Sequence, residues 1–597
     1  MQHENAIEPA PLRHGDLRPF FDDLERGLGF RAAFERLLRH LPEERADRLT
    51  QLLKESRGAW LTVLCTRGGE ALVVGAACSG SAAALARAGF AVTLLDPSRE
   101  RLRFALAAFE AFQVGRVRGL VGGRGRALPF AARAFDLVVL EQGLPDERFA
   151  PALDECRRVC RGQLFVMADN RLAYKRSGGG YHDFRLTRPL EYARALLRPR
   201  RGERTLRGYR AALAAAGFAP ARAFALYPHR RDFTHVVALD ERLPELPLGP
   251  NERRNKLKLL ARAAGLFPVL APSFGLVSAR RELCGRPSRI AHVLEELARR
   301  VGEPTPAAEQ VTGTRGDTIV VQTALAGGRA GEPAGRWTLH VALVRAHEEG
   351  LRLHLRMLAL LRERFPGVPA PEPLFAGPID GLWLSCERRL PGTSAIHQVG
   401  RRARAEAILG RVAGHLAQLV VRPPATFSEA DFDELLEPAF ELVARGAADA
   451  GTRAALAGMR ARARAGLVGH DLPRTLCHGD LRAKHVQVDA AGEVLGYLDW
   501  GAASDCALPY YDLLHLFVHD RQQARGRTEG EIWRALVARE GLRPAERAAF
   551  ERYREEVGLD EEAARALEAI YPVFVGRTAE THWRWSRPRW LARRFDL

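Results

Sequence analysis

Apolar positions recur in two different rhythms along the chain, and each rhythm predicts a different kind of element. Residues 21–41 carry apolar side chains three and four positions apart, which predicts amphipathic helices in an N-terminal helical segment, residues 1–60. Beyond it, short apolar runs typical of buried strands alternate with helical stretches. These runs are residues 71–80, 91–98, 135–142 and 163–170. Because strands that alternate with helices form parallel sheets covered on both faces, residues 61–283 are predicted to form an α/β Rossmann-like domain.

The pattern changes near residue 284. Residues 317–325 and 336–344 predict a pair of strands joined by a glycine-rich loop, and a helix is expected at residues 348–364. From about residue 400 the pattern is mostly helical, interrupted by residues 477–500. Residues 284–597 are therefore predicted to form a second domain, of the α+β class.

Composition narrows the class of protein. Hydrophobic residues make up 47% of the 597 residues and charged residues 27%, as in ordinary globular domains. The longest apolar stretch, residues 263–279, is broken by Pro268 and Pro272, so no membrane span is expected. The N-terminus does not resemble a signal peptide, and the eight cysteines form no CxxC pair. We therefore expect a cytoplasmic protein without a zinc ribbon or a disulfide framework.

The formal net charge of +18 would suit a nucleic-acid or anionic-lipid partner. However, lysine occurs at only five positions, and the arginines are spread along the chain rather than gathered in one arm. A compositional bias explains this pattern more simply, so we expect a small-molecule or glycan substrate rather than nucleic acid. RNA as a partner would rest on the charge alone.

The first candidate site follows the first predicted strand of the α/β domain. Gly75, Ala77 and Gly80 form a turn of small residues, where the backbone can approach a ligand and the next helix presents its N-terminal amides. The second strand ends at Asp96, whose carboxylate can accept hydrogen bonds from the hydroxyls of a ribose. Leu128 opens an apolar loop before a later strand.

In these features, residues 60–283 resemble the class I S-adenosylmethionine (SAM)-dependent methyltransferases. The resemblance implies that Gly75, Ala77 and Gly80 lie at the methionine part of SAM, that Asp96 holds the ribose, and that Leu128 flanks the adenine. The sequence departs from the family at two of the usual glycines and at the acid that usually precedes the apolar loop. A Rossmann-like domain that has lost its cofactor is therefore an alternative.

The methyl acceptor is predicted to lie near residues 169–189, a glycine-rich loop. His182 in this loop is the candidate general base for methylation of a hydroxyl. Other polar residues of the loop are Asn170, Tyr174, Lys175 and Asp183. The alternative is a surface loop with a solvated histidine.

The second candidate site is the segment His478-Gly479-Asp480, followed by Asp499 after a short predicted hairpin. Phosphoryl transfer needs one carboxylate to orient the attacking hydroxyl and another acid to hold magnesium on the phosphates. Asp480 and Asp499 suit these two roles.

These motifs resemble the aminoglycoside/choline phosphotransferase family, which has a two-lobed kinase-like fold, over residues 285–597. The resemblance implies ATP and Mg²⁺ as ligands, with Asp480 as catalytic base, Asp499 as metal ligand and Asp512 as a structural acid. It also places Gly313 and Gly316 in the turn that covers the phosphates. Glu387 would lie near the hinge between the lobes.

Three positions depart from that family. His485 stands where an asparagine usually coordinates the metal, His340 where a strand lysine pairs with the phosphates, and His354 where a helix glutamate pairs with that lysine. No lysine occurs between residues 259 and 483, so Lys484 is the candidate relocated cation. Both a divergent phosphotransferase and a pseudokinase remain open.

Together the two halves predict a SAM-dependent methyltransferase fused to a divergent phosphotransferase, acting on a small hydroxylated metabolite or glycan precursor. The alternative is a regulatory or scaffold protein whose pseudokinase module and degenerate methyltransferase fold bind ligands without chemistry. The sequence does not indicate the oligomeric state.

Overall fold

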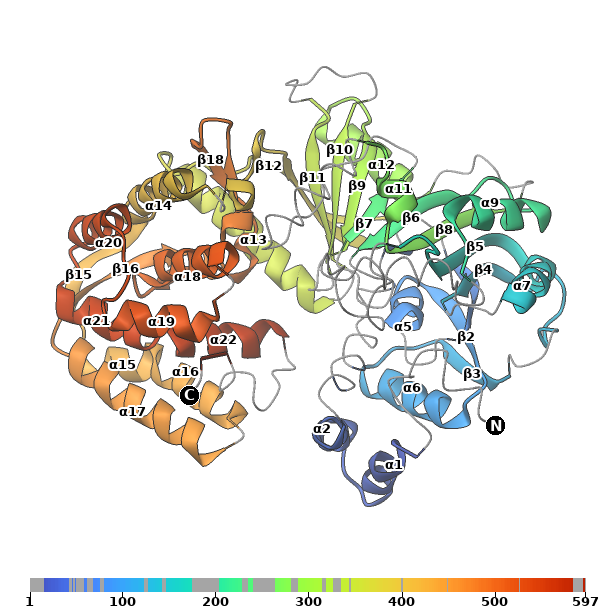
Figure 1. Ribbon diagram of the computed structural model, residues 1–597, viewed down its shortest axis with the longest axis horizontal. Coiled ribbons are helices and arrows are strands. Elements are labelled where there is room, and N and C mark those ends of the chain that lie inside the picture. The colour runs from blue at the N-terminus through green and yellow to red at the C-terminus, as the bar shows by residue number, and fades with distance from the viewer. Residues whose placement is uncertain are drawn as a thin grey trace, which may run out of the picture. The chain divides into compact units, whose positions relative to one another are not determined.

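The computed structural model describes the chain as two compact units (Figure 1). The described residues are 15–41, 46, 49, 58, 60–61, 68–75, 80–122, 127–141, 146–173, 203–227, 235–239, 264–280, 288–313, 318–325, 334–342, 345–398, 401–447, 449–525, 527–583 and 594–595. We call the first compact unit the sheet unit and the second compact unit the helical unit. The sheet unit comprises Met1–Leu246, Lys258–His347 and Gly377–Leu384, and the helical unit comprises Pro247–Leu257, Glu348–Ala376 and Ser385–Leu597.

The first half of the sheet unit is built on five parallel strands, in the order β3-β2-β1-β4-β5. Their bounds are β1 Gly69–Val74, β2 Phe90–Asp96, β3 Val117–Val121, β4 Phe135–Leu140 and β5 Cys160–Asp169. The helices between them are α5 Gly80–Arg87, α6 Arg99–Ala111 and α7 Asp146–Val159. The centres of β1 and β4 are buried, because helices cover both faces of a parallel sheet. The predicted alternation of strands and helices is confirmed.

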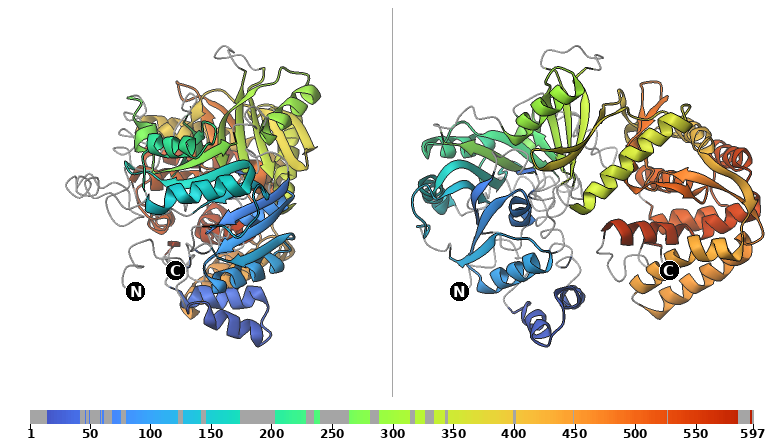
Figure 2. Two further views of the ribbon diagram at one scale, coloured as in Figure 1. Left: turned by 90° about the vertical axis from the view of Figure 1, so that its right-hand side faces the viewer. Right: turned by 180° about the vertical axis from the view of Figure 1, so that it is seen from behind.

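Antiparallel strands extend this sheet beyond β5 in the order β8, β6, β7. These are β8 Ser273–Ala279, β6 Arg222–Tyr227 and β7 His235–Ala238, with helices α9 Leu206–Ala215 and α11 Phe267–Leu270 alongside. Thr205 caps α9 through its side chain, which accepts a hydrogen bond from the Gly208 amide. N-terminal to β1, the helices α1 Arg18–Glu25 and α2 Phe30–His40 pack together, and α2 contacts α6 (Figure 2). Phe20 and Phe34 are buried there against Phe104 of α6.

The same sheet continues into the second half of the chain. Strand β7 pairs antiparallel with β9, with Val236 opposite Val311, and the sheet reaches thirteen strands through β10, β11, β13 and β12. The bounds of these strands are β9 Ala307–Gly313, β10 Thr318–Ala324, β11 Trp337–Ala342, β12 Pro373–Ile379 and β13 Leu382–Arg388. Helix α12 Arg289–Val301 packs on β9, capped by Ser288 and ended by Gly302 in a left-handed conformation. The predicted strand pair is confirmed as β10 and β11.

The helical unit contains most of the helices. Their bounds are α13 Arg345–Arg364, α14 Arg402–Ala417, α15 Glu429–Leu435, α16 Glu437–Gly446, α17 Ala450–Leu467, α18 Tyr511–Arg525, α19 Glu529–Val537, α20 Pro544–Val557, α21 Glu561–Ala569 and α22 Tyr571–Trp583. Helix α14 packs on α20, α17 on α21 and α16 on α22. The core of the unit includes the fully buried rings of Tyr497, Trp500 and Tyr571.

Two small sheets lie among these helices. One has the order β15-β16-β19, with bounds Val420–Thr426, Asp471–Cys477 and Ser504–Ala507. The other has the order β14-β17-β18, with bounds Thr393–Ser394, Val486–Val488 and Val494–Tyr497. The hairpin of β17 and β18 is the one expected between Asp480 and Asp499. Among the helices that the structure describes, none is long and apolar enough to cross a membrane. The domain bounds near residues 60 and 284 stay predictions from the sequence.

Candidate functional site

The Asp480 loop, which begins at His478, follows strand β16, and its backbone is fixed by a side chain of helix α18. The amides of His478 and Gly479 both donate to the carboxylate of Asp512, at 2.6 and 3.0 Å. Gly479 has φ +81°, and a Cβ at this position would lie 2.1 Å from the carbonyl oxygen of Ala502. A side chain is therefore excluded here, and the loop that presents Asp480 has one backbone path.

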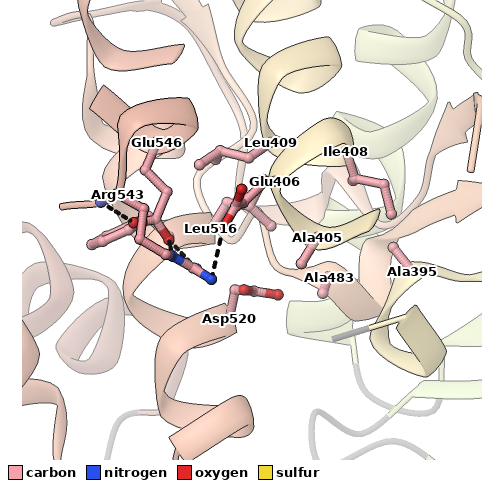
Figure 3. A pocket seen from close by; sticks show the side chains of 11 residues that line it. Ala395, Ala405, Glu406, Ile408, Leu409, Ala483, Leu516, Asp520, Arg543 and Glu546 are labelled. Carbon is pink, nitrogen blue, oxygen red and sulfur yellow. Dashed lines mark hydrogen bonds and ion pairs between the residues drawn. The ribbon is translucent and has the colours of Figure 1, made fainter. Parts of the chain in front are cut away.

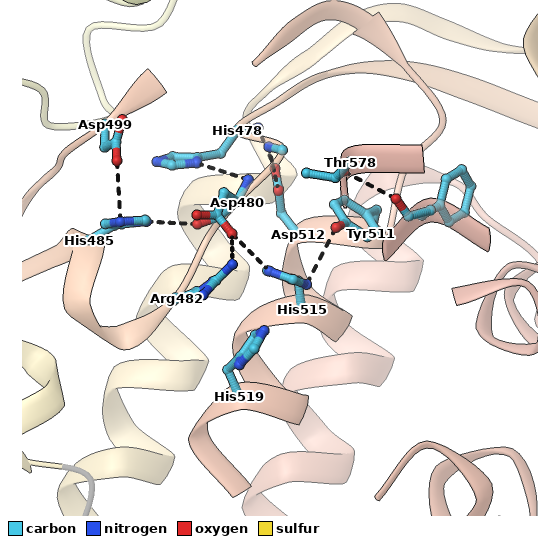
Figure 4. Close-up of polar contacts among 12 residues, drawn as sticks. His478, Asp480, Arg482, His485, Asp499, Tyr511, Asp512, His515, His519 and Thr578 are labelled. Carbon is cyan, nitrogen blue, oxygen red and sulfur yellow. Dashed lines mark hydrogen bonds and ion pairs between the residues drawn. The ribbon is translucent and has the colours of Figure 1, made fainter. Parts of the chain in front are cut away.

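The Asp480 carboxylate has two polar partners, Arg482 and His515 (Figure 4). A guanidinium nitrogen of Arg482 lies 2.5 Å from Oδ1, and Nε2 of His515 lies 3.2 Å from the same oxygen. On its other side, Nδ1 of His515 lies 2.9 Å from the Tyr571 hydroxyl. The His515 side chain is 3% exposed, and burial lowers the pKa of its imidazole. The ring is therefore neutral at pH 7, donating from Nε2 to Asp480 and accepting at Nδ1 from Tyr571.

This environment keeps Asp480 ionised. Burial by itself would raise the pKa of the carboxyl, but the hydrogen bond from His515 and the nearby His485 and Arg482 hold the pKa well below its usual range. Asp480 is thus a carboxylate at neutral pH, oriented by two side chains.

Asp499 follows strand β18 in the left-handed conformation, at φ 67° and ψ 61°. A non-glycine residue in this region stores strain of about 1–3 kcal/mol, and such residues cluster at functional sites. His485 lies between the two aspartates: its Nδ1 is 2.7 Å from the backbone oxygen of Asp480, and its Nε2 is 3.5 Å from Oδ2 of Asp499. Burial, with a smaller contribution from Lys484, lowers the pKa of His485 to about 3. The ring is neutral at pH 7.

A second buried chain of hydrogen bonds ties α13 to the Asp499 loop. Nε2 of His354 lies 2.8 Å from a carboxylate oxygen of Glu387, and the amide of Trp500 donates to Nδ1 of His354 at 3.0 Å. Because Nδ1 accepts this bond, Nε2 carries the proton and donates to Glu387. His354, predicted at the position of the family's helix glutamate, is therefore paired with the candidate hinge residue.

The other predicted nucleotide-binding residues are placed as follows. His340 lies on β11 of the sheet unit, opposite Val320, and Gly313 ends β9 in the same unit. Lys484 is exposed in the short 3₁₀ turn after Asp480. Gly316 lies outside the described residues.

A small cavity lies behind the Asp480 loop, between α14, α18 and α20 (Figure 3). Its volume of about 20 Å³ has room for about one water molecule. Arg543 pairs across its wall with Glu406, at 2.9 Å, and with Glu546. Burial raises the pKa of Asp520, which faces the same space, to about 7. The cavity is too small for a substrate.

In the sheet unit, Asp96 ends β2 as predicted, and its side chain is 1% exposed. Its Oδ1 accepts hydrogen bonds from the Ser98 amide at 2.8 Å and from Arg101 at 2.8 and 3.1 Å. A ribose would therefore share this carboxylate with Arg101. Gly75 follows directly after β1 with φ 77°, and Gly80 begins α5. Ala77 lies outside the described residues.

The apolar loop that begins at Leu128 is fixed to helix α7. The Leu128 amide donates to Glu155 at 2.7 Å, and Arg158 donates to the carbonyl oxygens of Leu128 and Phe130 at 2.8 and 2.7 Å. Asn170 has a structural position: its amide nitrogen donates to the backbone oxygens of Val269 and Ala271, each at 2.7 Å.

The predicted acceptor residues beyond Asn170 cannot be placed. His182, Tyr174, Lys175 and Asp183 lie outside the described residues.

Two residues that contact Asp480 were not singled out from the sequence, Arg482 and His515. For His515 the sequence holds a signal, since it follows Asp512 by three residues. Residues three apart share a helix face, so a histidine there faces the same loop as Asp512.

Two family models match the chain. The model described as Phosphotransferase enzyme family matches residues 328–590, and the model described as Methyltransferase domain matches residues 71–163. No curated protein matches.

Solved structures similar to this chain come from both groups. An aminoglycoside-3'-phosphotransferase of type VIII is 18% identical, with 47% of this chain and 99% of that chain covered and a TM-score of 0.31. An aminoglycoside phosphotransferase from Streptomyces rimosus, in complex with ADP and streptomycin, is 17% identical, with coverages of 44% and 90% and a TM-score of 0.29. A SAM-dependent methyltransferase from Aquifex aeolicus is 13% identical, with coverages of 38% and 90% and a TM-score of 0.23.

Each family match lies within one of the two halves predicted from the sequence. The methyltransferase match begins within β1 and ends within β5, and the phosphotransferase match includes Asp480, Asp499 and Asp512. The chain is an enzyme in which one region matches the methyltransferase domain model and another matches the phosphotransferase enzyme family model.

Proposed function

We propose that this protein transfers the γ-phosphoryl group of ATP to a hydroxyl of a small metabolite or glycan precursor, and a methyl group from SAM to the same molecule. The observation that carries the phosphotransferase part is the environment of Asp480. Its loop is fixed by Asp512, and its carboxylate is ionised and oriented by Arg482 and His515. Such an oriented carboxylate is what a general base for a hydroxyl requires.

In the proposed reaction, Asp480 accepts the proton of the acceptor hydroxyl. The hydroxyl oxygen forms a bond to the γ-phosphorus while the bond to the leaving ADP oxygen breaks. A divalent cation at Asp499 would neutralise charge on the phosphates. His515 holds Oδ1 of Asp480, and Arg482 adds a positive charge beside it.

For the nucleotide, the proposal assigns the phosphate-covering turn to Gly313 and Gly316 and the hinge to Glu387. Lys484 and Arg482 would supply cations in place of the strand lysine, where this chain has His340. Both are close to Asp480 in the sequence and belong to the helical unit.

For the methyl group, the proposal assigns SAM to Gly75, Ala77, Gly80, Asp96 and Leu128, with His182 as general base for the acceptor. The fixed Leu128 loop supports this assignment, because a preformed wall costs less entropy on binding. Fusion of the two activities would raise the local concentration of a shared intermediate.

A second candidate function is regulation or scaffolding without catalysis. It is favoured by the absence of lysine between residues 259 and 483 and by the pairing of Asp96 with Arg101. In that case both ligands bind but neither group is transferred.

The test of phosphoryl transfer uses the full chain, labelled ATP and a panel of hydroxylated small molecules that includes aminoglycosides and sugars. Loss of a general base lowers turnover by about 10²–10⁴-fold, so Asp480→Asn should abolish detectable transfer. Asp433→Asn, at an exposed acid of α15, is the control and should keep the wild-type rate. Equal rates in Asp480→Asn and wild type would overturn the assignment, and ATP binding without transfer would favour the second candidate.

The methyltransferase part is tested by calorimetric titration with S-adenosylhomocysteine. Binding in the micromolar range that is lost in Asp96→Ala supports the proposed SAM site. No binding at millimolar ligand rejects it and leaves the phosphotransferase part standing by itself.

A further inference from the structure

We infer that the cation site of the helical unit, formed by His485 and Asp499, binds a nitrogen-accepting divalent cation such as Mn²⁺ or Co²⁺ in preference to Mg²⁺. The inference rests on the proposed function only in taking Asp499 as a metal ligand. It concerns which metal the site selects.

The first step is the position of the proton on His485. Nδ1 lies 2.7 Å from the backbone oxygen of Asp480, and a carbonyl oxygen can only accept a hydrogen bond. Nδ1 therefore carries a proton and is used by the carbonyl, and Nε2 is the ring nitrogen placed toward Asp499. Metal-binding histidines have this arrangement, with one nitrogen donating to a backbone carbonyl and the other binding the metal.

The second step is the distance between Nε2 and the carboxylate of Asp499. Oδ2 of Asp499 lies 3.5 Å from Nε2 of His485 (Figure 4). This separation is longer than a direct N–H···O hydrogen bond, which spans about 2.7–3.2 Å. Two ligand atoms about 2.1 Å from one cation are about 3.0 Å apart at octahedral angles and about 3.4 Å apart at tetrahedral angles. The observed separation therefore suits two ligands of one cation.

The third step is the chemistry of the donor pair. Mg²⁺ selects oxygen donors, whereas imidazole suits first-row transition metals, whose affinity for such sites exceeds that of Mg²⁺. The family's asparagine would offer an amide oxygen at this position, and His485 offers nitrogen. The substitution changes the preferred metal rather than removing the site.

The fourth step is preorganisation of the two ligands. His485 is buried, and its ring orientation is fixed through Asp480. Asp499 is held in its left-handed conformation next to Trp500, whose amide is bound by the buried His354. The His485 ring and the backbone of Asp499 are therefore placed before a metal arrives, which favours binding.

The experiment is a titration of the full chain with Co²⁺, followed by visible absorption, and with Mn²⁺, followed by electron paramagnetic resonance, each with and without competing Mg²⁺. We expect wild type to bind Mn²⁺ about tenfold or more tightly than Mg²⁺. Spin-echo modulation from ¹⁴N should show imidazole bound to Mn²⁺. His485→Asn should lose the nitrogen signal and reverse the preference toward Mg²⁺.

The chain offers a matched control in a second histidine–aspartate pair, His470 and Asp560, 2.8 Å apart. His470→Asn should leave the metal preference and the nitrogen signal unchanged. The ¹⁴N measurement on wild type needs no variant, so it decides the inference even where His485→Asn does not fold.

The outcomes separate this inference from the proposed function. Absence of ¹⁴N coupling, or Mg²⁺ bound as tightly as Mn²⁺, overturns the inference even where Mg²⁺ supports phosphoryl transfer. Nitrogen-coordinated Mn²⁺ in a protein that transfers no phosphoryl group supports the inference and counts against the proposed function.

Discussion

At the residue scale, the proposed phosphoryl transfer depends on the environment of Asp480. His515 reaches the carboxylate from helix α18, and its own orientation is set by the hydroxyl of Tyr571. In the proposed reaction, a base fixed in this way would present its second oxygen to the acceptor in one direction. We therefore propose His515 as a positioning residue for Asp480.

Replacement of His515 should therefore affect turnover more than substrate binding. We expect His515→Phe to lower kcat by about tenfold or more with little change in KM. The carboxylate of Asp480 would lose a hydrogen bond and the orientation that this bond sets. His515→Asn, which keeps a donor, should recover part of the rate. Loss of this bond also raises the pKa of Asp480, so the acid limb of the pH–kcat profile should move to higher pH. An unchanged pH profile in His515→Phe would contradict the role.

Asp520 gives a prediction about stability and pH. Burial raises its pKa from 3.8 to about 7 in the folded chain. Between these values the folded state binds more protons than the unfolded state, so the free energy of unfolding falls as the pH rises from about 4 to 7. Asp520→Asn removes this dependence, since the amide does not ionise.

We therefore expect Asp520→Asn to become more stable relative to wild type as the pH rises, by a few kcal/mol at most, since one pKa unit corresponds to about 1.4 kcal/mol. Guanidinium unfolding of both proteins at pH 5 and pH 8 measures the difference. If the difference in the free energy of unfolding between Asp520→Asn and wild type is the same at pH 5 and pH 8, Asp520 is ionised at both pH values.

At the element scale, the loop after β16 depends on one backbone conformation. The turn at Gly479 combines a positive φ with a carbonyl oxygen 2.1 Å from the place of a Cβ. Gly469, which precedes the same strand, has φ +90° but nothing within 4 Å of its Cβ position. The two glycines therefore separate the cost of the left-handed conformation from the cost of the collision.

Gly479→Ala and Gly469→Ala should both lose about 1–2 kcal/mol of stability from the positive φ. Gly479→Ala should also displace the loop and lose phosphoryl transfer, whereas Gly469→Ala should keep it. Thermal unfolding and the transfer assay, run on both variants, make the comparison. Equal activity in the two variants would mean that the loop tolerates the displacement.

The elements themselves were largely predictable, because their signals are local. The strands β1, β2 and β4 are short apolar runs between helical stretches, and the hairpin of β17 and β18 turns at Gly492. Partners of side chains were less predictable. Asp96 was expected at the end of β2, but its pairing with Arg101 depends on the first turn of α6. The sequence marks His354 only as a departure from the family pattern, because its contact with Glu387 joins residues 33 positions apart.

At the scale of the whole molecule, the feature absent from the prediction is the pairing of β7 with β9. Each of these strands has an ordinary apolar pattern, and nothing in the sequence of one specifies the other. The pairing joins the strands of the methyltransferase half to those that precede α13, so that one sheet runs through both.

Division of the chain near residue 284 tests the importance of this pairing. We expect each half, expressed alone, to form oligomers or aggregates, and the two halves expressed together to purify as a complex. Light scattering and size-exclusion chromatography distinguish the cases. Two halves that are separately monomeric and stable would show that the pairing contributes little.

The pairing of β7 with β9 also bears on how such a fusion persists. An unpaired edge strand is a template for association with other chains, and proteins usually protect it with charges, prolines or a covering helix. Here each half covers the other's edge through Val236 and Val311. A gene truncated at the junction would therefore yield a product with a bare edge, prone to self-association. Selection against that product would keep the two transferase regions on one polypeptide, whether or not they share a substrate.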